Sequence, residues 1–248
     1  MRYCKSIVVL FALVLLLAHP GVASAQAPEL LLGKTGGSMS GRIVQIVAIL
    51  SVLSIAPSLL VMTTSFTRFV VALSFLRSGL GLQNTPGNVV VVSLALFLTF
   101  FVMSPTFEKA WREGVQPLVE QKIDEMEAAD RIVGPFREFM AANVRESDVR
   151  LLQNLRPGRI GNVDGAAPDI TILVPAFMIS ELRRGFEIGF LVALPFLVID
   201  LIVATITMSM GMMMLPPSVI GLPIKVLFFV LIDGWSLLVS GLVRSYGA

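Results

Sequence analysis

The fold is decided by one stretch, in which methionines gather between two long apolar runs: Thr205-Ile206-Thr207-Met208-Ser209-Met210-Gly211-Met212-Met213-Met214-Leu215-Pro216-Pro217. Five of the chain's twelve methionines lie here. The tandem prolines cannot continue a helix, because proline lacks a backbone N–H and restricts the residue before it. The stretch therefore predicts a turn between two apolar helices. Methionine is adaptable, so two interpretations are open: core at a helical hairpin, or a flexible apolar surface.

The composition is that of a membrane protein. Of the 248 residues, 55% are hydrophobic and only 15% charged, whereas soluble domains are about 25% charged. Apolar runs cover 43–67, 89–106, 188–215 and 219–243. Each is long enough to cross a bilayer as a helix. We expect an all-α fold of membrane-associated helical hairpins, with about four long apolar helices. The net charge of +2 gives no reason to expect nucleic acid as a partner.

The first 25 residues have the pattern of a cleavable signal peptide. A basic start precedes a short apolar run at 7–18, and an Ala-Ser-Ala triplet ends at Ala25. We predict cleavage between Ala25 and Gln26. The alternative, an uncleaved first transmembrane helix, is disfavoured by the short run. The glycine-rich segment 26–42 predicts a flexible tether.

Cleavage would remove Cys4 and His19, which are the chain's only cysteine and histidine. Disulfides, thiol nucleophiles, histidine bases and the commonest metal ligands would then be absent. No nucleotide-binding or hydrolase motif occurs either. We therefore predict no catalytic, cofactor-binding or metal-binding residues, and no enzyme activity.

Segment 107–168 differs from the apolar remainder. It holds 20 of the chain's 36 charged residues. Apolar residues recur at helical spacing within it, which predicts a charged helical insert. The insert separates a first apolar hairpin region, 43–106, from a second, 169–248, that contains the Met-rich turn. Glu181 and Arg184, three residues apart at the start of the second region, are expected to form a surface ion pair.

Three charged residues interrupt the last two apolar runs: Asp200, Lys225 and Asp233. A hairpin about the tandem prolines would place the two aspartates at similar depth and Lys225 level with Met208. Charges in apolar helices usually face protein or water. They are open to three interpretations: a proton relay, a polar seam between subunits, or helix-packing pairs. The spacing favours the last two.

The same pattern predicts a topology. Signal cleavage places the mature N-terminus in the periplasm. The turn after the first apolar run, with Arg68 and Arg77, then lies toward the cytoplasm, as cytoplasmic loops carry an excess of Lys and Arg. The insert returns to the periplasm.

Several ordered segments resemble the FliP family of flagellar type III export proteins, which is related to the SctR family of injectisomes. The resemblance covers about residues 43–245. It is carried by 64–68, 94–105, 175–190 and 210–217, and by Pro195-Phe196-Leu197-Val198-Ile199-Asp200-Leu201-Ile202 and Leu231-Ile232-Asp233-Gly234-Trp235.

The resemblance implies a non-enzymatic, oligomeric subunit of the export gate in the bacterial inner membrane and flagellar basal body. Expected partners are further copies of the chain, FliQ-like and FliR-like subunits, FlhA, FlhB and FliO-like proteins. Unfolded rod, hook and filament subunits would pass through the gate. It also implies that many apolar helices pack against neighbouring subunits rather than lipid.

If the chain is an export-gate subunit, as the resemblance implies, the Met-rich turn faces a pore. Met212, Met213 and Met214 are the predicted constriction, supported by Met208 and Met210, because soft side chains can seal a pore and yield to a passing chain. Asp200, Lys225, Asp233 and Arg68 are predicted charges at helix or subunit interfaces. The alternatives are an injectisome gate subunit, a proton-coupled small-solute transporter and a membrane scaffold.

Overall fold

The computed structural model describes residues 47, 50, 51, 54, 55, 57–82, 86–155, 168–211 and 216–247. The chain divides into two compact units, 1–54 and 55–248. Within the first, Ser51 Oγ donates to the Val47 carbonyl, as a helical serine does. The predicted signal peptide, its cleavage site at Ala25 and Gln26, and the tether 26–42 lie outside the described residues.

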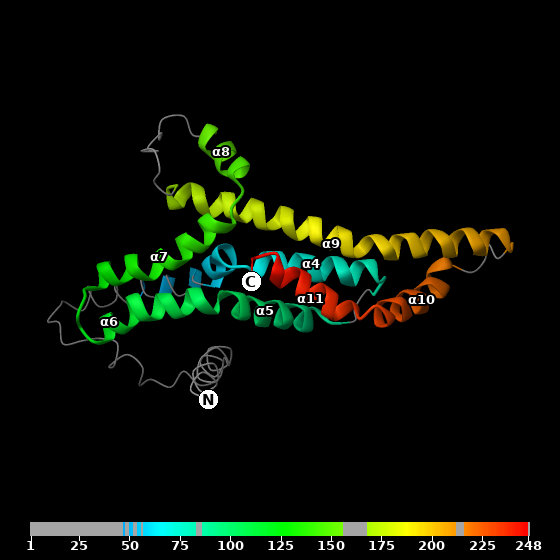
Figure 1. Ribbon diagram of the computed structural model, residues 1–248, viewed down its shortest axis with the longest axis horizontal. Coiled ribbons are helices and arrows are strands. Elements are labelled where there is room, and N and C mark those ends of the chain that lie inside the picture. Colours follow the sequence, from blue (N-terminus) through cyan, green and yellow to red (C-terminus); the bar gives the residue numbers. More distant parts are fainter. Residues whose placement is uncertain are drawn as a thin grey trace. The chain divides into compact units, whose positions relative to one another are not determined.

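The described part of the second unit is helical and contains no strand, which confirms the predicted all-α class (Figure 1). Its elements follow in chain order: α4 (Phe66–Gly79), α5 (Asn88–Ala110), the π-helical turn η1 (Trp111–Val115), α6 (Gln116–Val119), α7 (Glu125–Asn143), α8 (Glu146–Asn154), α9 (Ile170–Ser209), α10 (Pro217–Leu231) and α11 (Gly234–Arg244). The predicted charged insert thus forms helices as far as residue 154.

Local sequence explains where several helices begin and end. Asp124 accepts a hydrogen bond from the Glu127 N–H at the start of α7, and Asp169 does the same for Thr171 at the start of α9. Gly211, with a φ of +72°, follows the last turn of α9. Glycine adopts this left-handed conformation without steric cost, so it ends the helix.

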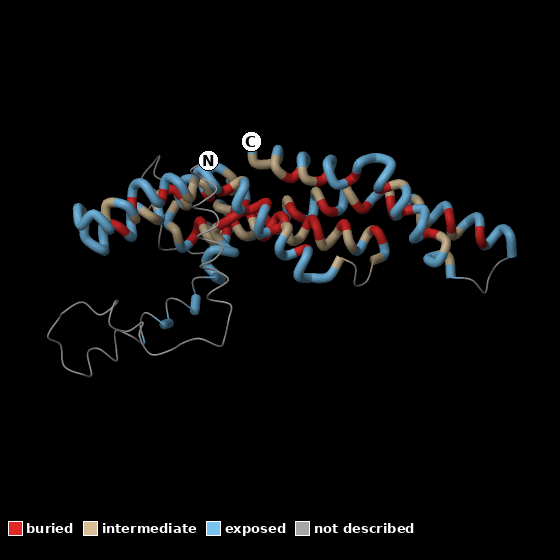
Figure 2. The backbone as a smooth tube through the Cα atoms, turned by 90° about the horizontal axis from the view of Figure 1, so that it is seen from below, coloured by how far each residue is buried: buried red, intermediate tan, exposed pale blue. Residues whose placement is uncertain are grey.

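The main core lies around α4, which packs against α5 and α9 (Figure 1). Its buried residues include Phe69, Leu73 and Leu76 of α4, Phe196 of α9 and Leu242 of α11. Figure 2 shows buried residues in red among exposed ones in pale blue. A smaller cluster joins α7 to the start of α9 through these residues: Met140, Leu173 and Phe177. The first part of α9 is therefore covered by the charged insert.

Two glycines let α9 approach α4 closely, as the Gly185-x-x-x-Gly189 spacing predicts. A Cβ atom on Gly189 would lie 2.7 Å from Phe75 Cβ, and one on Gly185 would lie 3.1 Å from Val71 Cβ. The distance at Gly189 is too short for a side chain unless the neighbouring atoms move, and the distance at Gly185 is tight but could be relieved by a shift of a few tenths of an ångström. The close contact therefore depends on the absence of side chains here.

Gly189→Ala is expected to destabilise the protein by about 1–3 kcal/mol, the usual cost of overpacking. Alanine's helix propensity alone would stabilise by about 1 kcal/mol. Gly134→Ala in α7 is the matched control, because no atom from outside its own turns of helix lies within 4 Å of its Cβ position. Thermal unfolding in detergent measures both. Equal shifts for the two variants would contradict the proposed close contact.

Two helices in the described ranges are long and apolar enough to cross a membrane, Asn88–Val119 and α9. Two bent pairs raise the number to four if each pair is one span. One joins a helix at Pro57–Thr63 to α4 with an 80° bend, and the other joins α10 to α11 with a 64° bend. The predicted number of about four apolar segments is therefore reached only if each bent pair counts as one, and the first pair extends to Gly79, beyond the predicted run 43–67.

Candidate functional site

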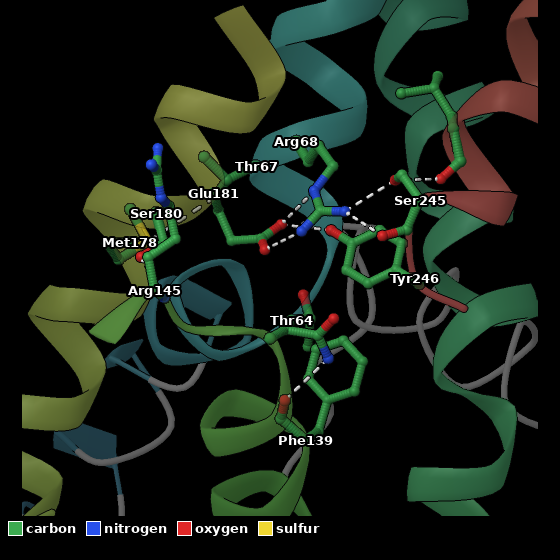
Figure 3. Close-up of polar contacts among 12 residues, drawn as sticks. Thr64, Thr67, Arg68, Phe139, Arg145, Met178, Ser180, Glu181, Ser245 and Tyr246 are labelled. Atoms are coloured by element: carbon green, nitrogen blue, oxygen red, sulfur yellow. Dashed lines mark hydrogen bonds and ion pairs between the residues drawn. The ribbon is translucent and has the colours of Figure 1, made fainter. Parts of the chain in front are cut away.

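A fully buried ion pair joins the first turn of α4 to α9 (Figure 3). Arg68 Nε donates to Glu181 Oε2 at 3.0 Å, and Nη2 donates to Oε1. Neither side chain is exposed to solvent. A buried charge needs a well-placed partner, since leaving either one alone is costly. The pair therefore ties together two helices that lie 113 residues apart in sequence.

The segment after α11 completes this site. Arg68 Nη1 donates to the Ser245 carbonyl at 3.1 Å and to Ser245 Oγ at 2.7 Å. The Tyr246 hydroxyl donates to Glu181 Oε2, and the Tyr246 ring lies 3.6 Å from Arg68 Cζ. Tyr246 also stacks on Phe139 of α7. Four helices thus meet at one neutralised charge cluster, which we call the buried cluster: Arg68, Glu181, Ser245 and Tyr246.

The environment keeps the Tyr246 hydroxyl protonated. Burial, and next the negative charge of Glu181, raise the pKa of Tyr246 well above its ordinary value of 10.0, although Arg68 opposes this. The phenol therefore remains a hydrogen-bond donor to the carboxylate. This supplies a third donor to Glu181, in addition to two N–H groups of the Arg68 guanidinium.

Two sequence-based expectations were wrong here. Glu181 does not pair with Arg184 on the surface, because it faces the protein interior and binds Arg68. Arg68 does not lie in a turn with Arg77, because the two occupy opposite ends of α4. The sequence did carry a signal for Glu181, which is the first charge in an otherwise uncharged start of α9. Ser245 and Tyr246 gave no such signal.

A second charged contact joins α9, α10 and the end of α4. Lys225 Nζ lies 2.5 Å from Asp200 Oδ2 and donates to the Gly79 carbonyl at 3.0 Å. Lys225 is only 5% exposed. The expected register was therefore wrong: Lys225 faces Asp200 and not Met208. The reason is that α9 ends at Ser209, so the helices are separated by 210–216 rather than by a tight turn at the prolines.

Asp233 lies apart from this contact. It occupies the break between α10 and α11, with a φ of +51°, and its side chain is exposed. Aspartate tolerates this left-handed conformation better than most residues. Asp233 lies eight residues after Lys225, which is the partner of Asp200. The structure therefore does not bring the two aspartates together. The predicted role of Asp233 at an interface stays a prediction.

Of the five predicted constriction residues, the structure describes Met208 and Met210. They are 64% and 67% exposed at the end of α9. Met212, Met213 and Met214 lie outside the described residues. Exposed methionines at the end of an apolar helix fit an apolar surface rather than hairpin core.

The ionisable groups of the described segments do not form a metal-binding arrangement: none of them gather as three or more His, Cys, Asp or Glu residues that could hold an ion. In each of the two charged contacts the opposite charges neutralise each other, and each contact joins two helices. Their chemistry is that of packing and positioning.

Residues 49–242 match the FliP family. The "Flagellar biosynthetic protein FliP" of Agrobacterium fabrum is 56% identical over 241 residues, which cover 96% of this chain and 98% of that protein. The proteins of the same name from Rhizobium meliloti and Bacillus subtilis are 55% and 45% identical, over 94% and 82% of this chain and 97% and 91% of theirs.

Proposed function

Because the chain belongs to the FliP family of flagellar biosynthetic proteins, which are components of the flagellar export apparatus, we propose that it is a pore-forming subunit of the export gate. In this role several copies assemble with FliQ-like and FliR-like subunits in the inner membrane. FlhA, FlhB and FliO-like proteins act beside them, and unfolded rod, hook and filament subunits pass through. The subunit itself catalyses no reaction.

One observation carries the pore-forming part of the proposal. One face of the second half of α9 is apolar as far as its methionine end and is not covered by the rest of the described chain. Leu191, Leu201 and Ile206 are 64%, 66% and 53% exposed, followed by Met208 and Met210. Apolar patches of this extent mark contact with lipid or with other subunits. A ring of copies would cover the sides and direct the methionine ends toward a shared axis.

The proton-coupled transporter is the weaker alternative. It relied on Asp200 and Asp233 acting together, whereas Asp200 contacts Lys225 and Asp233 lies at the α10–α11 break. The injectisome alternative is weaker because the relatives named above carry the flagellar name. The periplasmic placement of the insert and the multi-pass topology belong to the proposal as well.

Replacing Met212, Met213 and Met214 together by alanine is expected to raise ion leakage through the assembled gate while assembly stays intact. Shorter side chains would leave the constriction open, since alanine lacks the adaptable thioether. Conductance of the purified assembly in planar bilayers measures the leak. Met126→Ala on α7, where the side chain is 78% exposed, is the control. Unchanged conductance in an intact triple-variant assembly would overturn the predicted methionine constriction.

A further inference from the structure

A basic cleft lies beside α9, at the corner where α7 is followed by α8. It has a volume of about 410 Å³ and is lined by Arg145, Arg184, Glu187 and Ile188. Arg145 Nη1 lies 3.6 Å from Glu187 Oε1, a loose and exposed pair. Arg184 forms no hydrogen bond or ion pair with any described residue, and Glu181 of the same helix is engaged by Arg68 and Tyr246. Two guanidinium groups thus share one exposed carboxylate, which leaves the cleft positively charged.

The backbone that presents Arg145 is held in place. The Arg145 N–H donates to Ser180 Oγ at 3.1 Å, and that hydroxyl donates to Asp148 Oδ2 at 2.8 Å (Figure 3 labels Arg145 and Ser180). Ser180 is fully buried, and Asp148 is only 4% exposed. The α7–α8 corner is therefore fixed on α9, and the Asp148 carboxylate faces Ser180 rather than solvent.

The opposite end of the charged insert is acidic. Residues 111–130, which form η1, α6 and the start of α7, include six acidic and only two basic residues. Glu113 and Glu125 are exposed, and neither forms an ion pair with a described residue. Trp111 and Val119, both apolar and exposed, lie on the same elements. We call residues 111–130 the acidic end.

The acidic end is also held in place. The turn η1 packs against α7 so closely that a Cβ atom on Gly114 would lie 2.4 Å from Ile132 Cγ1. Asp124 caps α7 by accepting a hydrogen bond from the Glu127 N–H. Irregular π-helical turns inside α-helices are frequent at functional sites. The exposed carboxylates and apolar side chains are therefore presented on a fixed surface.

The basic cleft and the acidic end cannot meet within one chain. The acidic end includes the start of α7, whereas Arg145 follows the end of that helix (Figure 1). The 19 residues of α7 are about 28 Å long at 1.5 Å per residue. A contact between the two surfaces would therefore join two copies head to tail. Such a contact, repeated from copy to copy, closes a ring or continues as a helix.

We propose that the acidic end of one copy docks into the basic cleft of the next. This inference rests on the proposed function, in which several copies assemble, and it names the surfaces that meet. Exposed carboxylates of the acidic end bind Arg145 and Arg184, because guanidinium groups form strong, paired hydrogen bonds with carboxylates. Trp111 and Val119 pack on the apolar surface of α9, which begins at Leu191, one helical turn beyond the cleft. Tryptophan and arginine are the residues that most often anchor protein interfaces.

Charge reversal tests the contact in the full chain, purified as its assembly. Arg145→Glu/Arg184→Glu is expected to lower the assembled fraction about tenfold, because like charges would then face each other. Glu113→Lys/Glu125→Lys is expected to do the same from the other side. The quadruple variant is expected to recover assembly, since opposite charges face each other again. Native mass spectrometry measures the assembled fraction and the number of copies.

Arg150→Glu is the matched control. Arg150 lies on α8, is exposed, and pairs with Glu146 instead of lining the cleft. It reverses the same kind of charge and should leave assembly unchanged. Recovery in the quadruple variant cannot arise from misfolding, because misfolding would add to the defects of the two double variants.

Cross-linking gives a second measurement that leaves all four charges in place. Cys4 is the chain's only cysteine, so Cys4→Ser provides a background without thiols. In that background Gln116→Cys on α6 and Ser147→Cys on α8 place one thiol beside each surface. A short bismaleimide is expected to join the copies of this variant into a ladder of two, three and more chains. Neither cysteine alone should give a ladder.

Three outcomes would overturn the proposal: both charge-reversal double variants assemble like the wild type, the quadruple variant fails to recover and no cross-linked ladder forms, or the ladder stops at two chains. The last would mean that two copies pair reciprocally instead of head to tail. The gate function survives all three, because copies could assemble through other surfaces. A wild-type chain that never forms an oligomer would instead refute the gate function itself.

Discussion

Glu181→Ala is expected to destabilise the protein by about 3–5 kcal/mol and to abolish assembly of the export gate. That is the range observed when one partner of a buried ion pair is removed. The variant leaves the Arg68 guanidinium fully buried, with the Ser245 oxygens as its remaining acceptors among the described residues. It also leaves the buried Tyr246 hydroxyl without its acceptor. The loss would therefore spread over four helices that meet at the buried cluster.

Thermal unfolding of the purified protein and gel filtration of the assembly measure this effect. Glu187→Ala is the control on the same helix. Its carboxylate is 59% exposed and pairs loosely with Arg145, so its loss should cost no more than about 1 kcal/mol.

A double variant separates the buried charge from lost packing. Arg68→Met/Glu181→Leu removes both charges and should be clearly more stable than Glu181→Ala, since apolar replacement of a whole buried pair is often tolerated. If the double variant were less stable than Glu181→Ala, an unpaired charge would not be the cause of the defect.

Asp200→Asn is expected to lower stability by about 2–3 kcal/mol and to weaken assembly. Asparagine keeps the shape of the side chain but removes the charge that Lys225 faces at 2.5 Å. Lys225 would then lie buried with the Gly79 carbonyl as its remaining described acceptor. A buried charge left without its counter-charge costs more than a neutral polar group. The effect is smaller than at Glu181, because the Asp200 side chain is 45% exposed.

Asp130→Asn is the matched control for Asp200→Asn. It makes the same chemical change at an exposed side chain of α7. Surface changes of this kind usually shift stability by less than about 0.5 kcal/mol. Secretion of hook and filament subunits is measured beside stability. Full assembly of Asp200→Asn with lost secretion would contradict the packing role and support a proton relay.

The helices could be predicted from the sequence, because helical periodicity and hydropathy are local properties of the chain. The apolar runs, the charged insert and the close approach at Gly185 and Gly189 all follow from residues near one another in the chain. The breaks were harder to predict. The run 219–243 is continuous in hydropathy, yet it bends by 64° at Asp233, where Gly234 allows the backbone to pass the Phe229 ring. A Cβ on Gly234 would lie 2.2 Å from that ring.

The sequence by itself determined the all-α class, the apolar segments and the FliP family, since each is written in composition and ordered motifs. Only the tertiary structure decided which charges meet. Arg68 binds Glu181, which lies 113 residues away in sequence. Lys225 binds Asp200 because α9 ends at Ser209, and this end determines which residues of α9 and α10 lie opposite each other. Helix spacing predicts contacts between residues three or four positions apart, but the partner of a buried charge depends on which helices pack together. That is why Glu181 faces Arg68 instead of the nearby Arg184.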